Sequence, residues 1–388
     1  MAISKMKKVC FVATADWQVK MFLLEHIKTL SNKFEITVVM NAPNMTSLKS
    51  LGLDVPVRAV HIERPISILL DFKALLELFY LFRTCRFDIV HSIAPKSGLL
   101  SMCAAFFAGV QIRVHIYTGQ IWATKSGVMR WLLRMMDRIT AFFATNILTD
   151  SHSQMVFLIN ENVVSREKIS VLAKGSVCGV DTMRFIANNR KRASVRNSLS
   201  LKESDIVFLF LGRLNIEKGV LDLANAFSRV CVSFSSSHLI FVGPDEGNMQ
   251  QKIKDICITN RCKVHFIGFT EYPEDYIAAA DVLCLPSYRE GFGQVIIEAA
   301  AAGIPALGSR IYGITDAIEE GKTGLLFEAG NVNDLTDKMI QFLKYPTLRK
   351  EMGGRARERV SRDFSKDILI QAMLNYYELK LIDPEKLK

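Results

Sequence analysis

Short apolar runs alternate with longer segments of helical period along the whole 388-residue chain, and this alternation limits the possible folds most strongly. Runs such as VCFVATA and IVFLFLGR are apolar on both faces, which is typical of strands in parallel sheets covered by helices. Six such runs precede the polar segment 186–205, and six follow it. We therefore predict an α/β protein of two Rossmann-like, doubly wound domains that face a central cleft, with ligands at the carboxyl ends of the strands.

The polar segment also sets the expected domain boundaries. We expect a first domain over 1–185, a linker over 186–205, a second domain over 206–365 and a C-terminal helical segment, 366–388, that packs back on the first domain. The eight cysteines show no Cys-x-x-Cys spacing and no nearby histidine cluster, which predicts buried free thiols and no zinc site. No signal-peptide pattern is visible, and the run ISILLDFKALLELFYLF carries three charges, so we expect a cytoplasmic protein without a membrane span.

Basic charge is concentrated in the N-terminal half of the chain. Residues 1–180 contain 21 Lys and Arg against 12 Asp and Glu, whereas the remainder is nearly balanced. This excess predicts an anionic partner for the first domain. Nucleic acid is disfavoured as that partner, because the chain lacks the basic and aromatic array of a single-strand platform. An anionic membrane surface fits better.

Three arginines repeat at four-residue spacing in the segment GVMRWLLRMMDR and predict a basic stripe on one helix. A basic amphipathic helix that also carries tryptophan is typical of contact with anionic lipid. The alternative is an ordinary surface helix whose apolar face packs on the sheet. The residues expected to contact the membrane are Trp122, Lys125, Arg130, Trp131, Arg134 and Arg138.

The segment FLGRLNIEKG joins a predicted strand to a predicted helix and carries two basic residues, Arg213 and Lys218. Such a turn places free backbone N–H groups near the crevice of a doubly wound sheet. A guanidinium can form two hydrogen bonds to phosphate oxygens, and a lysine adds a mobile positive charge. The two residues could therefore hold a pyrophosphate. The alternative is that both only cap exposed ends of secondary structure.

A second strand-to-helix turn, SYREGFGQVIIE, contains two carboxylates eight residues apart, Glu290 and Glu298. Gly291 and Gly293 allow a ligand to approach the backbone closely, and the helix N-terminus favours an anion. Because Glu298 lies more than one turn inside the helix, the two carboxylates can accept hydrogen bonds from different hydroxyls of one extended ligand. The alternatives are a helix-terminal acid for Glu290 and a solvated face for Glu298, although Glu298 lies between apolar neighbours.

The motifs GRL, EKG and EGFGQVIIE, in this order, resemble the retaining GT-B glycosyltransferases of glycosyltransferase family 4. The resemblance covers essentially the whole chain, including GITDAIEEGKTGLLFEAGNVNDL. It implies the GT-B fold and a nucleotide-sugar donor, with no metal required, and no Asp-x-Asp motif is present at a strand end. The donor site that it implies consists of Arg213, Lys218, Glu290, Gly291, Phe292, Gly293, Gln294 and Glu298.

By the same resemblance, the roles within the donor site differ. Glu290 contacts hydroxyls of the donor sugar, whereas Glu298 binds the nucleotide ribose. Arg213 and Lys218 hold the diphosphate and stabilise the leaving nucleotide. Glu290, Arg213 and Lys218 are therefore the expected catalytic residues, and no protein base is assigned.

The N-terminal half most resembles a bacterial subgroup that extends polyprenyl-diphosphate-linked oligosaccharides of surface polysaccharides or glycoproteins. It departs from the family in lacking a Gly-Gly turn after the first strand, where it has ATADWQVK, and in having Cys178 at a position that is often Asn. The acceptor-binding candidates are Lys96, His115, Thr118 and Gly119. Lys96 could equally be a surface lysine, and His115 could be a core histidine inside its strand.

These expectations lead to one main hypothesis and two alternatives. The main hypothesis is a retaining transferase that moves a hexosyl or N-acetylhexosaminyl group from a nucleotide sugar, with UDP favoured, to a polyprenyl-diphosphate-linked glycan at the cytoplasmic face of the inner membrane. One alternative is a family member with a soluble sugar or metabolite as acceptor. The other is a non-catalytic module that binds a nucleotide sugar.

Overall fold

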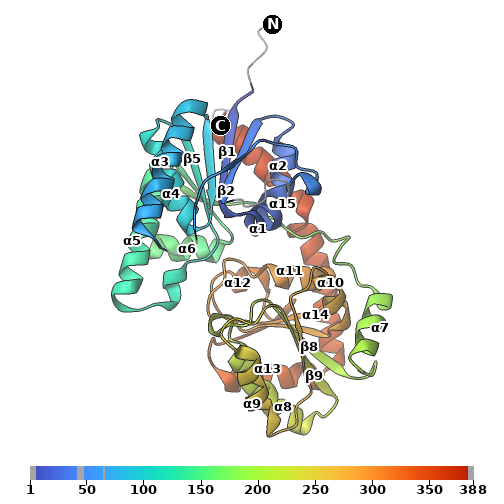
Figure 1. Ribbon diagram of the computed structural model, residues 1–388. Helices are drawn as coiled ribbons and strands as arrows, with labels where there is room; N and C mark the ends of the chain where they lie inside the picture. Colours follow the sequence, from blue (N-terminus) through green and yellow to red (C-terminus); the bar gives the residue numbers. More distant parts are fainter. Residues whose placement is uncertain (1–5, 42–47, 64–65, 383–388) are drawn as a thin grey trace. The chain divides into compact units, whose positions relative to one another are not determined.

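The computed structural model describes residues 6–41, 48–63 and 66–382 and divides into two compact units, each built on one parallel sheet (Figure 1). The first unit contains the chain up to Cys178 together with the segment from Asp367 onward. The second unit is Gly179–Lys366. The ends of the expected first and last segments, 1–5 and 383–388, lie outside the described residues.

The sheet of the first unit has the strand order β3-β2-β1-β4-β5-β6-β7, and all neighbouring strands are parallel. Its strands are β1 (Lys8–Ala15), β2 (Glu35–Asn41), β3 (Val57–Ala59), β4 (Ile89–Ile93), β5 (Ile112–Tyr117), β6 (Asn146–Thr149) and β7 (Ile169–Val171). β3 was not predicted from the sequence, because this edge strand of three residues is too short and too exposed to form an apolar run.

Helices cover both faces of this sheet. Alternate residues of β1 explain the two layers, since Phe11 joins the core beneath α2 and α15 while Cys10 and Val12 join the core beneath α3, α4 and α6 (Figure 1). The helices of this unit are α1 (Asp16–Gln18), α2 (Leu24–Leu30), α3 (Ile68–Cys85), α4 (Pro95–Phe107), α5 (Gly127–Phe143), α6 (His152–Asn160) and α15 (Lys366–Asn375). Thus α15, from the far end of the chain, contributes Leu369 and Met373 to the core of the first unit.

The second unit repeats the same architecture with the strand order β10-β9-β8-β11-β12-β13. Its strands are β8 (Ile206–Leu211), β9 (Ser237–Val242), β10 (Val264–Gly268), β11 (Val282–Leu285), β12 (Ala306–Ser309) and β13 (Gly324–Phe327). Its helices are α7 (Asn189–Ser198), α8 (Val220–Ser233), α9 (Met249–Ile258), α10 (Pro273–Ala279), α11 (Gln294–Ala301), α12 (Ile314–Ala317), α13 (Val332–Lys344) and α14 (Pro346–Asp363). The expectation of two doubly wound parallel sheets is confirmed.

The segment 186–205, expected to be a linker, lies within the second unit instead. It forms α7, which packs on α10 and buries the side chain of Arg196 against Asp281, with 2.8 Å between Arg196 Nη2 and Asp281 Oδ2. The segment has no apolar period because a buried arginine, rather than an apolar stripe, attaches the helix. The chain passes between the units earlier, at Cys178 and Gly179.

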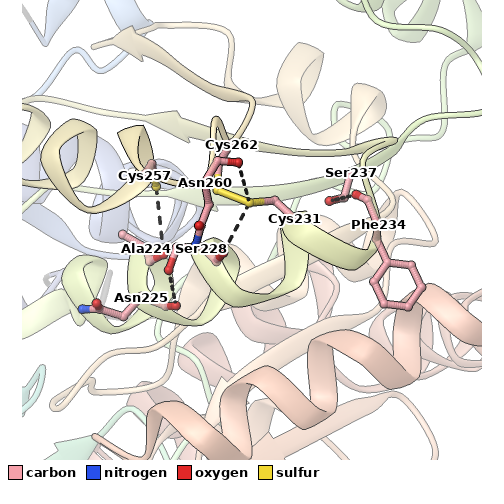
Figure 2. Close-up of a disulfide and its surroundings, with 9 residues drawn as sticks. All are labelled: Ala224, Asn225, Ser228, Cys231, Phe234, Ser237, Cys257, Asn260 and Cys262. Atoms are coloured by element: carbon pink, nitrogen blue, oxygen red, sulfur yellow. Dashed lines mark hydrogen bonds between the residues drawn. A yellow bond between two sulfur atoms is a disulfide. The ribbon is translucent and has the colours of Figure 1, made fainter.

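The expectation that all eight cysteines are free thiols is wrong. Cys231 and Cys262 form a disulfide whose Cα atoms are 5.6 Å apart, although the residues are 31 positions apart in sequence (Figure 2). Cys231 lies in the last turn of α8, and Cys262 lies in the turn between α9 and β10. Only the packing of α8 against α9 brings the two sulfur atoms together.

No helix in the described part of the chain is long and apolar enough to cross a bilayer. Within the same residues, no group of three or more His, Cys, Asp or Glu side chains could hold a metal ion.

Candidate active site

Two loops lie side by side where the strand order of the second sheet reverses. β8 and β11 are hydrogen-bonded neighbours there, so the loop Gly212–Gly219 lies next to the loop Pro286–Gly293. Ligands of doubly wound sheets bind at this reversal, outside the carboxyl ends of the strands. The two motifs singled out in the sequence therefore meet at the position where the fold favours a ligand.

Lys218 and Glu290 form an ion pair across the two loops, through Lys218 Nζ and Glu290 Oε1. Ser287 Oγ donates a hydrogen bond to the same carboxylate oxygen at 2.7 Å. Both members of the pair are largely buried, with 21% and 14% of their side chains exposed. A cation and an anion are thus held within reach of one ligand. Because both are largely shielded from water, their electrostatic interaction with that ligand is stronger than it would be at the surface.

Gly219 allows the two loops to approach this closely. Its φ of +66° is left-handed, and a Cβ atom added there would lie 2.0 Å from the carbonyl oxygen of Pro286. On the N-terminal side, Asn215 caps the short 3-10 turn Ile216–Lys218 by accepting a hydrogen bond from the Lys218 N–H at 3.1 Å. The backbone on both sides of Lys218 is therefore fixed, and its side chain extends from a rigid turn.

Three further contacts hold the loop after β11 against the segment after β8, and they involve residues that were not predicted from the sequence. The Arg289 Nη2 atom lies 2.8 Å from Glu217 Oε2, and the Tyr288 N–H donates to the Glu217 carbonyl at 2.9 Å. The Tyr288 hydroxyl donates to Asp222 Oδ2 at 2.6 Å, which raises the pKa of Tyr288 to about 12. The only sequence signal was adjacency, since Glu217 precedes Lys218 and Arg289 precedes Glu290.

Arg213, the second predicted cation, is more exposed. Its Nη1 atom lies 3.2 Å and 3.1 Å from the two carboxylate oxygens of Glu246 in the loop after β9. Asn215 Nδ2 donates to Glu246 Oε2 at 2.9 Å. Half of the Arg213 side chain is exposed, at 50%, so this guanidinium remains accessible to a ligand anion.

The glycine turn leads directly into α11. Gly293 is the N-cap of this helix, and its left-handed φ of +83° explains the glycine at this position. Gln294 donates from Nε2 to the Gly179 carbonyl at 2.7 Å. Phe292, expected in the donor site, has only 4% of its surface exposed and packs on Phe364, with ring centroids 5.2 Å apart. Its side chain belongs to the core, so only its backbone can contact a ligand.

Glu298 lies in the interior of α11 and is almost completely buried, which excludes the solvated face considered above. Burial raises the pKa of its carboxyl to about 7, while Arg184 and a hydrogen bond with Gln294 oppose that shift. A buried carboxylate needs hydrogen-bond donors, and a pair of sugar hydroxyls would supply them.

The acceptor-binding candidates do not form one group. Lys96, in the first turn of α4, lies 2.5 Å from Asp71 Oδ1 of α3 through its Nζ atom. Thr118 and Gly119 follow β5, next to the strand that precedes Lys96. His115, in contrast, is completely buried within β5. The expectation that it contacts an acceptor is corrected, because its Nδ1 lies 2.9 Å from Ser92 Oγ and burial lowers its pKa to about 3.

The arginine stripe of α5 makes specific contacts with the end of α6. Arg130 Nη2 and Arg134 Nη1 lie 2.7 Å and 3.1 Å from the carboxylate oxygens of Glu161. Arg138 Nε donates to the carbonyl of Asn162 at 2.9 Å. Cations near a helix C-terminus stabilise its last carbonyl groups, so these contacts with the end of α6 account for the spacing of the three arginines.

Trp122 is also placed differently from the expectation. It is 1% exposed, stacks on Phe157 with ring centroids 5.1 Å apart, and donates from Nε1 to Asp137 Oδ2 at 2.7 Å. It therefore cannot contact a membrane surface. Lys125 and Trp131 are exposed, the latter at 62%.

Two family models match the chain, one in each half. The model described as "Glycosyl transferase 4-like domain" matches residues 30–175. The model described as "Glycosyl transferases group 1" matches residues 191–359, which include both loops of the site.

Several curated proteins are similar to most of the chain. The capsular polysaccharide biosynthesis glycosyltransferase CapM of Staphylococcus aureus is 28% identical over 327 residues, which are 84% of this chain and 86% of that protein. An Escherichia coli UDP-Gal:alpha-D-GlcNAc-diphosphoundecaprenol alpha-1,3-galactosyltransferase is 26% identical over 83% of this chain and 86% of its own length. An N,N'-diacetylbacillosaminyl-diphospho-undecaprenol alpha-1,3-N-acetylgalactosaminyltransferase of Campylobacter jejuni is 24% identical over 96% of this chain and 98% of its own length.

Among solved structures, Anabaena HepE in complex with UDP superimposes with a TM-score of 0.79 at 17% identity, covering 95% of this chain and 98% of that one. At this identity the similarity concerns the fold alone. It matches the two parallel-sheet units described above.

Proposed function

Because the chain belongs to the GT-B glycosyltransferases of family 4, we propose that it is a retaining, metal-independent transferase that moves a hexosyl or N-acetylhexosaminyl group from a UDP-sugar to a polyprenyl-diphosphate-linked glycan. The observation that carries this proposal is the pairing of Lys218 with Glu290 where the strand order of the second sheet reverses. A cation for a diphosphate and a carboxylate for sugar hydroxyls are thereby adjacent, as a nucleotide sugar requires.

In the proposed reaction, the bond between the anomeric carbon and the diphosphate oxygen breaks while the acceptor oxygen bonds to the same face of the sugar. The leaving phosphate oxygen takes the proton of the acceptor hydroxyl. Arg213 and Lys218 balance the negative charge that develops on the leaving nucleotide, so the protein itself supplies two positive charges at that point. When the donor binds, Lys218 leaves its ion pair with Glu290 and contacts the phosphate, and Glu290 accepts hydrogen bonds from the sugar hydroxyls.

A screen of nucleotide sugars by thermal shift, followed by a product assay, tests this proposal. The matching donor should raise the melting temperature, because a ligand that binds only the folded protein stabilises it by mass action. We expect UDP-sugars to produce this shift and one of them to yield product with a lipid-linked acceptor. Binding without turnover on any acceptor would indicate a non-catalytic module, and turnover on free sugars alone would indicate a soluble acceptor. The absence of a shift with every donor would contradict the proposal.

The lipid-linked acceptor is supported by two of the relatives, whose names specify undecaprenol diphosphate substrates. It is also supported by the excess of basic residues in the N-terminal half. Within the first unit, Lys96 remains the candidate for an acceptor phosphate, because it lies at the carboxyl end of β4 in the first turn of α4. To reach a phosphate, it would have to exchange its ion pair with Asp71.

We also place the proposed contact with an anionic membrane on apolar side chains rather than on the arginines. Helices α3 and α5 both pack on α4 and expose large apolar residues, where a globular surface would normally be polar (Figure 1). The most exposed aliphatic and aromatic side chains include Ile68, Leu69 and Phe72 on α3 and Val128, Trp131 and Phe142 on α5. Tryptophan and aliphatic groups of this kind partition into the interface between lipid headgroups and acyl chains.

A Val128→Ser/Trp131→Gln double variant should sediment with anionic vesicles several-fold less than the parent protein, because both changed side chains are exposed and apolar. Its circular dichroism and melting temperature should stay close to those of the parent. A matched control, Val232→Ser/Ile258→Gln, alters two equally exposed residues of the second unit and should sediment like the parent. Equal sedimentation of all three proteins would contradict this membrane surface.

A further inference from the structure

Glu246 places its carboxylate against both polar side chains at the start of the loop after β8. Its two oxygens lie 3.2 Å and 3.1 Å from Arg213 Nη1, and Oε2 also lies 2.9 Å from Asn215 Nδ2. A carboxylate that accepts hydrogen bonds from a guanidinium and an amide occupies donors that a phosphate group could also use. The contact thus involves the same arginine that the proposed function assigns to the donor diphosphate.

The backbone holds Glu246 in this place. The Glu246 N–H donates to the Leu214 carbonyl at 2.9 Å, and the Leu214 N–H donates to the Pro244 carbonyl at 2.8 Å. Gly243 brings the two loops together, since a Cβ atom added there would lie 2.0 Å from the carbonyl oxygen of Gly212. The contact between Glu246 and Arg213 is therefore built on paired loops rather than on two mobile surface side chains.

The neighbouring residue, Asp245, caps the helix that follows this loop. Asp245 Oδ1 accepts a hydrogen bond from the Met249 N–H at 2.7 Å, and its Oδ2 accepts one from the Gln250 N–H at 3.2 Å. These bonds satisfy the first turn of α9. Helix capping therefore explains Asp245, whereas the Glu246 carboxylate contacts Arg213 and Asn215.

We propose that the Glu246 carboxylate is a built-in competitor of the donor diphosphate that limits the affinity of the site for nucleotides. This inference rests on the proposed function and adds a residue that sets donor affinity. The ion pair is about half exposed, 50% at Arg213 and 43% at Glu246, and such pairs are weak enough for a ligand to displace. The displaced carboxylate would then lie near the phosphates and favour release of the nucleotide product by like-charge repulsion.

The test compares the parent protein with Glu246→Gln, which keeps the size and hydrogen-bonding capacity of the side chain but removes its charge. UDP affinity is measured by titration calorimetry at low and high salt, with GDP in parallel, and uridine binding by ligand-observed NMR. We expect Glu246→Gln to bind UDP about 3- to 5-fold more tightly at low salt, with a smaller gain at high salt, where exposed charges are screened. Uridine, which lacks phosphates, should bind both proteins equally.

A matched control is Glu203→Gln, which removes an exposed carboxylate paired with Arg192 at 2.8 Å, before the first strand of the same unit. It should bind UDP like the parent. Equal or weaker UDP binding by Glu246→Gln would overturn the inference, as would tighter binding of uridine, which would indicate a general change of the loop. If the parent itself binds neither UDP nor GDP, the proposed function fails as well, so the two failures are distinguishable.

Discussion

A Lys218→Ala variant should transfer sugar about 100-fold or more slowly than the parent protein. Lys218 is the less exposed of the two cations at the proposed diphosphate site, and its turn is fixed by Asn215 and Gly219. Loss of one preorganised group that stabilises developing charge typically costs about 100- to 1000-fold in kcat. A Glu290→Gln variant should lose a similar factor, because the amide keeps a contact for Ser287 but loses the negative charge. Initial rates with saturating donor and a lipid-linked acceptor measure both effects.

The fold should survive these changes, so melting temperatures should fall by only a few degrees. Lys191→Ala provides the control, because it removes a lysine paired with Asp275 at 2.6 Å in the same unit, on α7 rather than in either loop. Its transfer rate should match that of the parent. Rates within about threefold of the parent for Lys218→Ala or Glu290→Gln would show that these residues do not have the proposed roles.

An Arg196→Ala variant should lower the free energy of unfolding of the second unit by about 3–5 kcal/mol. The Arg196 side chain is 2% exposed and donates hydrogen bonds to Asp281 and to the carbonyls of Ala279, Lys202, Glu203 and Asp205. Asp281 would keep Arg192 at 3.1 Å but lose its more deeply buried cation, and four carbonyl groups would also lose a donor, which costs about 1–3 kcal/mol for each group left unsatisfied. Urea unfolding followed by circular dichroism measures the loss.

Arg190→Ala is the natural comparison, because Arg190 lies on the same helix with an exposed side chain. It should change the free energy of unfolding by less than about 0.5 kcal/mol, as substitutions of exposed residues usually do. A loss below about 1 kcal/mol for Arg196→Ala would show that α7 is a tether rather than an integral part of the second unit.

Much of the fold follows from local pattern. Runs such as VCFVATA and HLIFVG predict buried strands because a parallel strand must be apolar on both faces wherever it lies in the sheet. The twelve predicted strands are all present, and only the short edge strand β3 was missed. The two site loops were predictable for a similar reason. Glycine and charged residues directly after an apolar run indicate a strand-to-helix turn, and ligands bind at such turns in doubly wound sheets.

Contacts between distant segments were not predictable in this way. The periodicity of Arg130, Arg134 and Arg138 places them on one face of a helix but cannot say what that face meets, and here it meets Glu161. Tryptophan is a residue type common at membrane surfaces, yet Trp122 stacks on Phe157 and lies in the core.

The sequence by itself determined the alternating elements, the two parallel sheets and the residues of the two site loops, because these depend on neighbours along the chain. Only the tertiary structure decided the Cys231–Cys262 disulfide, the burial of Arg196, and the pairing of Arg213 with Glu246. Each of these depends on a partner that the fold brings close from a separate element. The presence of a cysteine or a charged residue in the sequence does not identify its partner. The contact becomes favourable only through the proximity and burial that arise when the elements pack.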